Sequence, residues 1–272
     1  MADANTVRRI ARLAGVGEGD HVVEVGAGVG SLTLALAETG ASVVAVEVDR
    51  RLVPVLAEVV AGHDVVIVAG DAASLDWSVV LEGAPAWRLV ANLPYNIATP
   101  LVLDLLREVP QIESMLVMVQ REAGERLAAD AGEAAVGIPS MLVAYHGVAR
   151  VVGRVPASVF VPRPNVESVL VSIDRHRSPP VVAPLSEIEP ILRKAYGQRR
   201  KNASSLARGP DRRGWVRGCR CRFDGATPGS VARRMGPTGR APSASVGLVG
   251  SGRDDRDGAR QADSVAADHR GS

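Results

Sequence analysis

Apolar residues in the first 175 positions occur in two kinds of stretch that differ in period. Short continuous runs rich in Val and Ala are typical of strands buried on both faces of a parallel sheet. In the stretches between them, apolar residues recur every three or four positions, as on one face of a helix. The predicted strands are residues 21–25, 42–46, 65–68, 88–91 and 115–119, and the predicted helices are residues 5–14, from 31 onward, 51–60, 99–107 and 121–129. This alternation predicts an α/β fold with a mostly parallel, doubly wound sheet.

Two longer apolar runs, residues 141–155 and 167–173, follow the alternating part of the chain. We expect both to be strands that form an antiparallel hairpin at one edge of the sheet. Residues 156–164 between them contain prolines at both ends, which predicts a stiff loop. This loop carries one aromatic side chain, Phe160, which is predicted to be exposed.

The alternating pattern ends at residues 176–180, which we predict to be a domain boundary. Residues 186–196 beyond it have a helical apolar face. After about residue 207, Gly, Arg, Ser, Pro and Asp dominate, and such a segment buries too little apolar surface to offset its chain entropy. We therefore predict an α/β domain over residues 1–176, the start of a small, incomplete helical domain over 177–206, and a disordered Arg/Gly/Ser-rich tail over 207–272.

The net charge of +2 is misleading when it is taken for the whole chain. From Arg208 onward, 13 Arg face 7 Asp, so residues 1–206 carry an acidic excess. Global charge is thus weak evidence for nucleic-acid binding, and a local basic cluster is better evidence. That cluster consists of Arg193, Lys194, Arg199, Arg200 and Lys201.

The composition narrows the class of protein in two further ways. No stretch reaches the ~18 apolar residues of a spanning helix, and the N-terminus lacks the apolar segment of a signal peptide, so we predict a cytoplasmic protein. The two cysteines, Cys219 and Cys221, form neither a disulfide framework nor a convincing zinc site, because no second pair or His partner accompanies them.

Four candidate features follow the carboxyl ends of successive predicted strands: the glycine turn (residues 26–30), Glu47, Asp71 and Asn92. In open α/β sheets the ligand crevice lies outside these strand ends, so the four are expected to converge on one pocket. Each has an ordinary alternative. The glycine turn is compatible with a purely structural role, Glu47 with a solvated strand end, and Asp71 with a turn or helix cap.

Together the first three features describe an adenosine pocket. Gly26, Gly28 and Gly30 let the backbone approach a ligand at a helix N-terminus, with Ser31 as the expected N-cap in place of a third fingerprint glycine. Glu47 lies where an acid clasps both ribose hydroxyls. Asp71 is expected to accept from the adenine amino group and the Ala72 amide to donate to the ring. No phosphate-binding arrangement appears, which favours S-adenosylmethionine over a dinucleotide.

The fourth feature, Asn92-Leu93-Pro94-Tyr95, is suited to a planar amine. The Asn92 side-chain oxygen and the carbonyl of Leu93 or Pro94 would accept from an adenine amino group and free its lone pair to attack a sulfonium methyl. Tyr95 and Phe160 would stack on the two faces of a flipped-out base, at ~1–3 kcal/mol per base. The alternative for Phe160 is a hydrophobic plug beneath the hairpin.

The chain resembles the small-subunit ribosomal RNA adenine N6,N6-dimethyltransferases over roughly residues 3–206. The motifs that carry the resemblance occur in the family's order and with similar spacing. They are Glu24-Val-Gly-Ala-Gly-Val-Gly30, Val46-Glu47-Val48-Asp49, Gly70-Asp71, Asn92-Leu-Pro-Tyr95, Val119-Gln-Arg-Glu122 and Val159-Phe-Val-Pro-Arg-Pro-Asn-Val-Glu-Ser168.

The resemblance implies a Rossmann-like methyltransferase that uses S-adenosylmethionine. Its implied target is two adjacent adenines near the 3′ end of small-subunit RNA, within a pre-ribosomal 30S particle, and the protein is expected to be a monomer. The implied cofactor-binding residues are Glu24, Gly26, Gly28, Gly30, Glu47, Asp71, Ala72 and Asn92. The implied residues around the target base, with a catalytic role, are Asn92, Leu93, Pro94, Tyr95 and Phe160. The implied RNA-binding residues are Arg199, Arg200 and Lys201. Gln120, Arg121 and Glu122 match a family motif that we interpret as structural.

Two departures from the family pattern concern the ends of the chain. The family begins with a Gly-Gln-Asn-Phe-Leu-type motif that closes over the cofactor, whereas this chain starts just after it, which indicates a misplaced start codon or a pocket that lacks part of its wall. The sequence beyond about residue 207 resembles out-of-frame translation of a GC-rich gene, and we interpret Arg208 onward as following a frameshift. Two alternative functions stay open: a large-subunit RNA adenine N6-methyltransferase of the macrolide-resistance type, and a non-catalytic ribosome-assembly factor.

Overall fold

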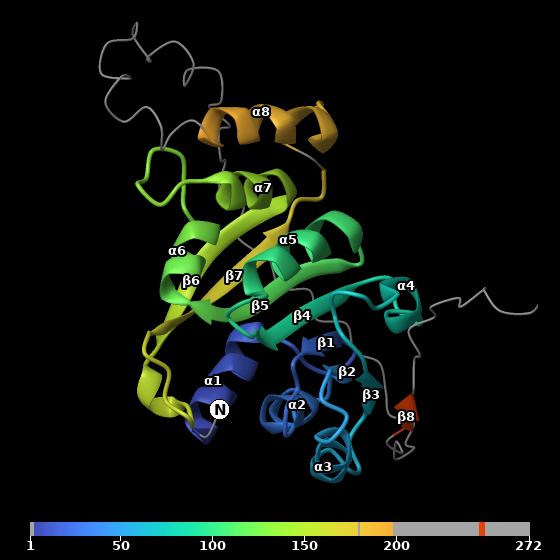
Figure 1. Ribbon diagram of the computed structural model, residues 1–272. Helices are drawn as coiled ribbons and strands as arrows, with labels where there is room; N and C mark the ends of the chain where they lie inside the picture. The colour runs from blue at the N-terminus through green and yellow to red at the C-terminus, as the bar shows by residue number, and fades with distance from the viewer. Residues whose placement is uncertain (1–2, 179, 198–244, 248–272) are drawn as a thin grey trace, which may run out of the picture.

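The computed structural model describes residues 3–178, 180–197 and 245–247. Its centre is an eight-stranded sheet with the order β6-β7-β5-β4-β1-β2-β3-β8 (Figure 1). The strands are β1 His21–Val25, β2 Ser42–Glu47, β3 Val65–Ala69, β4 Trp87–Asn92, β5 Ile112–Gln120, β6 Gly147–Val155, β7 Ser168–Arg175 and β8 Ser245–Gly247. The helices are α1 Ala4–Ala14, α2 Ser31–Ala37, α3 Val53–Val59, α4 Trp77–Val80, α5 Ala98–Glu108, α6 Arg121–Leu127, α7 Ile138–His146 and α8 Leu185–Gly197, with a 3-10 turn at Ala157–Val159.

Strands β1 to β5 are mutually parallel, and β7 runs antiparallel to both β5 and β6. The predicted antiparallel pair at one edge of the sheet is therefore confirmed. The register brings Ser168, the first residue of β7, opposite Gln120 at the end of β5 and Val155 at the end of β6. The segment that links β6 to β7 consequently emerges at the carboxyl end of β5.

Successive residues of a strand point to opposite sides of the sheet, and helices cover both sides. Val22 and Val43 pack with α1, α2 and α3, whereas Val23 and Val44 pack with α4, α5 and side chains of α6 and α7. Figure 1 shows the same arrangement, with α1 to α3 on one side of the sheet and α5 to α7 on the other. The Rossmann-like α/β fold predicted from the continuous apolar strands is confirmed.

The prediction of a continuous strand-forming run at residues 141–155 is wrong. Helix α7 occupies its first part, and only β6, from Gly147, is a strand. Pro139 lies in the first turn of α7, and the Ser140 hydroxyl accepts from the Gly137 amide at 2.9 Å, which stabilises the helix start. Because α7 is apolar on most sides, its sequence has no clear helical period.

Ser31 does not N-cap α2 as predicted. Gly30 holds the N-cap position with φ 86°, and no side chain caps the helix there. Ser31 is already the first helical residue, so the left-handed backbone at Gly30, rather than a hydroxyl, sets the entry into the helix.

The region beyond the predicted boundary is partly described. Helix α8 confirms the helix predicted at residues 186–196. Within the tail that the sequence predicts to be disordered, the three residues of β8 pair in parallel with β3. Without β8, β3 would be the edge strand and would offer unpaired backbone groups to any segment beside it. The remainder of the tail, with Cys219 and Cys221, lies outside the described residues.

Arg175, the last residue of β7, ties that strand to the end of α5. Its guanidinium group donates to the carbonyl oxygens of Leu106 at 2.8 Å, Ile112 at 2.9 Å and Val109 at 3.1 Å. Leu106 and Val109 lie at the C-terminus of α5, where helix carbonyls lack partners within the helix. One side chain from 60 to 70 residues away thus caps the helix that follows β4.

Within the described ranges, no helix is both long and apolar enough to cross a lipid bilayer. The same residues contain no cluster of three or more His, Cys, Asp or Glu side chains that is arranged to hold a metal ion.

Candidate active site

The glycine turn and the loop after β4 meet at the point where the strand order changes direction. Strand β1 has β4 on one side and β2 on the other, so its carboxyl end is the topological switch point at which open α/β sheets bind ligands. A methyl group built on Gly26 would lie 3.7 Å from the Asn92 carbonyl oxygen and 3.8 Å from Pro94 Cδ. The structure thus places the glycine turn next to the acceptor loop (residues 92–95), as the sequence predicts.

The glycine turn requires glycine for two different reasons. Gly26, Gly28 and Gly30 all have positive φ, at 78°, 60° and 86°. Among the described residues, a Cβ atom on Gly28 would meet nothing within 4 Å, so this part of the turn is not packed against them. A Cβ atom on Gly30 would lie 2.8 Å from the Leu56 side chain, so Gly30 instead permits close packing. Gly28 is therefore the position at which a ligand can approach the backbone.

Glu47 holds the glycine turn in place. One carboxylate oxygen accepts from the Gly28 amide at 2.7 Å, and the other accepts from the Asp49 amide at 2.8 Å. The side chain is buried, which excludes the alternative of a solvated strand end. Each oxygen has a further lone pair, so Glu47 can both brace the turn and accept from two ligand hydroxyls.

Glu24 is a buried carboxyl group at the base of the same region. Its Oε2 atom and the Thr33 hydroxyl oxygen are buried without a hydrogen-bond partner of good geometry among the described residues. Burial raises the pKa of Glu24 to about 8; the nearby Thr33 hydroxyl lowers this pKa in part, and the Glu47 carboxylate raises it further. In the free protein at neutral pH, Glu24 is therefore mainly a neutral acid.

Asp71 and Ala72 follow β3, next to the end of β2. The Gly70 amide donates to the Glu47 carbonyl at 3.0 Å, which joins the two strand ends. Asp71 is exposed and accepts from the Ala73 amide at 3.0 Å, as expected for a turn cap, while Ala72 is buried. Their predicted contacts with an adenine ring stay a prediction.

Tyr95 and Phe160, far apart in sequence, line one cavity of about 290 Å³ with the rest of the acceptor loop. Its lining is Asn92, Leu93, Pro94, Tyr95, Phe160, Pro162 and Pro164. Phe160 also packs partly against the core on the side of α1 to α3, so the plug and the pocket wall are compatible roles. The structure therefore assembles the five residues predicted around a target base, although their catalytic role stays a prediction.

The acceptor loop is stiff because its backbone is bonded on both sides. The Leu93 amide donates to the Met118 carbonyl at 3.2 Å, and Leu93 is fully buried. The Pro94 carbonyl accepts from Ile97 and Ala98 at 3.1 and 3.0 Å, at the start of α5. The loop is thus anchored to β5 and to α5, which leaves the side chains of Asn92 and Tyr95 at its rim.

Two polar residues near the site are not predicted from the sequence. Ser168 is fully buried, and its hydroxyl lies 2.8 Å from the Tyr95 hydroxyl. It ends the last of the family motifs, which is the one signal that would have marked it. Thr33 is buried beside Glu24, and a polar residue on the apolar face of α2 was its only signal. The predicted RNA-binding residues Arg199, Arg200 and Lys201 lie outside the described residues.

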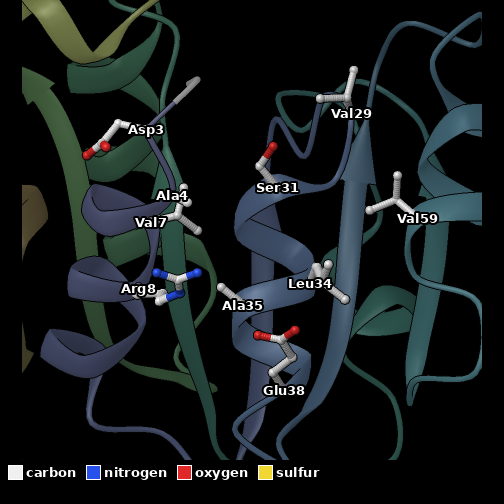
Figure 2. Close-up of a pocket in the computed structure, with 10 residues that line it drawn as sticks. All are labelled: Asp3, Ala4, Val7, Arg8, Val29, Ser31, Leu34, Ala35, Glu38 and Val59. Atoms are coloured by element: carbon white, nitrogen blue, oxygen red, sulfur yellow. The ribbon is translucent and has the colours of Figure 1, made fainter.

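A separate cavity of about 410 Å³ lies between α1 and α2 (Figure 2). Figure 2 shows Ala4, Val7 and Arg8 on α1 across from Leu34, Ala35 and Glu38 on or next to α2. The cavity borders the glycine turn through Val29 and Ser31, but its lining does not include Glu47, Asp71 or Asn92. It is therefore a neighbour of the candidate active site and not the predicted adenosine pocket.

The comparisons with known proteins agree on one family. The family model described as ribosomal RNA adenine dimethylase matches residues 1–209. Proteins named ribosomal RNA small subunit methyltransferase A are 49% identical in Leifsonia xyli over 66% of this chain and 65% of the relative, and 43% identical in Streptomyces avermitilis over 77% and 72%. The Nocardia farcinica protein of the same name is 41% identical over 89% of this chain and 80% of the relative. This chain thus aligns with about two thirds to four fifths of these relatives' length.

Solved structures show the same relationship at lower identity. A dimethyladenosine transferase from Plasmodium falciparum has a TM-score of 0.63 and 25% identity over 73% of this chain and 71% of that one. The 23S rRNA methyltransferase ErmE has a TM-score of 0.62 and 27% identity over 79% and 87%. On the family match and the identity to its relatives, the chain belongs to the ribosomal RNA adenine dimethylase family.

Proposed function

We propose that this chain transfers methyl groups from S-adenosylmethionine to the N6 atoms of two adjacent adenines near the 3′ end of small-subunit ribosomal RNA. The observation that carries the proposal is that a Cβ atom built on Gly26 would lie within 4 Å of both the Asn92 carbonyl oxygen and Pro94. A methyl donor on the glycine turn and an amine on the acceptor loop would lie side by side. The names of the relatives support the small-subunit RNA as the substrate.

The residues after β1 and β2 fit the cofactor. At Gly28 a ligand can approach the protein backbone closely. Glu47 accepts from the Gly28 and Asp49 amides and keeps further lone pairs for ribose hydroxyls. We assign the adenine end to Asp71 and Ala72. When bound, S-adenosylmethionine supplies an electrophilic methyl group on a positively charged sulfur.

The acceptor loop would prepare the adenine amine for attack. The Asn92 side-chain oxygen accepts one amino hydrogen, and we assign the second to the Leu93 carbonyl, because the Pro94 carbonyl already accepts from two amides of α5. Both bonds favour a pyramidal nitrogen with a free lone pair. Tyr95 and Phe160 would hold the flipped-out ring between them in the cavity of about 290 Å³.

We further propose how the chain meets its RNA. Residues 1–176 act as the catalytic domain, and the helical segment that begins at 177 is the start of the RNA-docking domain. Arg199, Arg200 and Lys201 would contact phosphates there. The substrate would be the RNA within a pre-ribosomal 30S particle in the cytoplasm, bound by a single copy of the chain.

A second candidate is methylation of a large-subunit RNA adenine. It is favoured by the likeness to ErmE, whose TM-score is within 0.01 of that of the dimethyladenosine transferase. Fold similarity therefore does not separate the two substrates. The curated relatives at 41–49% identity carry the small-subunit name, which is why we prefer the small-subunit RNA.

A methyl-transfer assay with undermethylated small subunits and with free large-subunit RNA tests the proposal. We expect transfer to the small subunit, and a loss of about 10²- to 10³-fold in rate for Asn92→Ala, as for the removal of one preorganised polar contact. Asn96→Ala is the matched control, because Asn96 is exposed just beyond the acceptor loop. Its rate should stay within about twofold of the wild type.

Three results would contradict parts of the proposal. Full activity of Asn92→Ala would refute the role of the acceptor loop. Transfer to large-subunit RNA alone would assign the chain to the second candidate. Binding to small subunits without any transfer would identify it as a non-catalytic assembly factor.

A further inference from the structure

The hydrogen bond between Tyr95 and Ser168 joins two segments that are 73 residues apart. Ser168 is the first residue of β7, is 0% exposed, and is held between β5 and β6 by its pairing with Gln120 and Val155. Its hydroxyl lies 2.8 Å from the phenol oxygen of Tyr95, which is only half-buried. A fixed group thus contacts the tip of a side chain that otherwise rotates about two bonds.

The same part of β7 anchors the loop that carries Phe160. The Arg121 amide donates to the Glu167 carbonyl at 3.0 Å, and the Arg121 side chain pairs with the Glu167 carboxylate at 3.1 Å. Residues 161–166 between Phe160 and this anchor are mostly exposed. The start of β7 therefore contacts Tyr95 through Ser168, and Glu167 just before it anchors the far end of the loop that carries Phe160.

We propose that Ser168 is a positioning residue for the target base, which it serves by fixing where the Tyr95 ring stands at the cavity wall. The inference rests on the proposed function for its link to methyl transfer, but the contact itself does not. The phenol oxygen lies on the axis about which the ring turns, so a bond to it fixes the place of the ring and leaves the ring able to present its face to a base. Without the bond to Ser168, the ring samples other rotamers about the Cα–Cβ bond, and a base that enters meets the productive one only part of the time.

The test compares Ser168→Ala, Tyr95→Phe and the double variant in single-turnover methyl transfer to undermethylated small subunits. Each single change removes the same bond, so each should lower the rate by about three- to tenfold, and the double variant should lose no more than the larger single loss. The affinity for S-adenosylmethionine should not change. Ser168→Thr keeps the hydroxyl and suits a strand, so it should restore the rate.

Ser172→Ala is the matched control, because Ser172 lies four residues further along β7 on the same strand face. A purely structural role of Ser168 would lower the stability and leave the single-turnover rate of the folded fraction unchanged. Losses that multiply in the double variant would likewise overturn the inference. Where Ser168→Ala does not fold, Tyr95→Phe and Ser168→Thr carry the same comparison.

A second measurement does not depend on activity. The chain has three tyrosines, so ring-¹³C-tyrosine NMR gives few signals, and Tyr95→Phe identifies that of Tyr95. We expect Ser168→Ala to shift or broaden this signal and Ser168→Thr to leave it nearly unchanged. An unaltered Tyr95 signal in Ser168→Ala would overturn the inference even if the enzyme is active. A shifted signal in a protein without transfer activity would mean instead that the proposed function has failed.

Discussion

Replacement of Glu24 by Gln should stabilise the protein relative to the wild type, and this difference should grow as the pH rises. Glutamine has nearly the same shape but no ionisable group, so the variant removes the charge from a fully buried position. The pKa of Glu24 is about 8 in the folded chain against an ordinary value of 4.5. At roughly 1.4 kcal/mol per pH unit, this difference corresponds to about 5 kcal/mol.

The sign of the effect depends on the pH at which each state releases the proton. Below pH 4.5 the carboxyl is protonated in both states and adds no pH dependence. Between pH 4.5 and about 8 the unfolded chain releases the proton while the folded chain retains it, so the wild type loses stability as the pH rises. Above about pH 8 the full penalty of a buried charge is present. The stability that the neutral form of Glu24 preserves is therefore lost from the wild type as the pH rises to the folded-state pKa of about 8.

Urea unfolding of both proteins at a series of pH values measures this effect. The free energy of unfolding of Glu24→Gln minus that of the wild type should grow by about 3–5 kcal/mol between pH 5 and pH 8. A constant offset from the buried amide does not affect the slope. Glu58→Gln, at an exposed helical position, is the matched control for the same substitution. Parallel stability curves for Glu24→Gln and the wild type would refute the assignment of a neutral buried acid.

Two further predictions concern Gly124, in the helix after β5, and Glu47. Gly124→Ala should destabilise the protein by about 1–3 kcal/mol in urea unfolding, although Ala has the better helix propensity. The reason is that the new methyl group would overlap Val169 and lie 3.0 Å from Val171 Cγ2. A stabilised variant would contradict this. Glu47→Ala should weaken S-adenosylmethionine binding by about 10- to 100-fold in calorimetry, because the ligand bonds and the brace on Gly28 are lost together; unchanged affinity would limit Glu47 to a structural role.

The convergence of the strand ends is predictable from the sequence because it is a consequence of the parallel order of the strands. Once residues 21–25, 42–46 and 88–91 are assigned as parallel strands, the glycine turn, Glu47 and Asn92 must lie at one edge of the sheet. The family motifs independently add Phe160, which no local pattern connects with Tyr95. This much of the site is encoded by local apolar runs and by the polar residues directly after them.

The features that the sequence does not predict depend on contacts between distant residues. Ser168 reaches Tyr95 only through the pairing of β7 with β5, and no local period signals that register. The sequence of α7 does not distinguish a helix from a strand, because an element buried on most sides shows neither period. The raised pKa of Glu24 arises from burial, which a sequence motif does not report.

The bonds from Arg175 to the end of α5 have a consequence for synthesis of the chain. A ribosome makes the segment from β1 to α5 first, but until Arg175 has emerged the carbonyls of Leu106 and Val109 lack the bonds that its guanidinium group donates. Strand β5 also lacks β7 as its neighbour until then, and its edge stays open to other chains. The C-terminal end of α5 therefore gains this cap late, after nearly the whole sheet has been translated. A chain released before residue 175 would contain every residue of the acceptor loop but not the contacts that hold the adjoining helix.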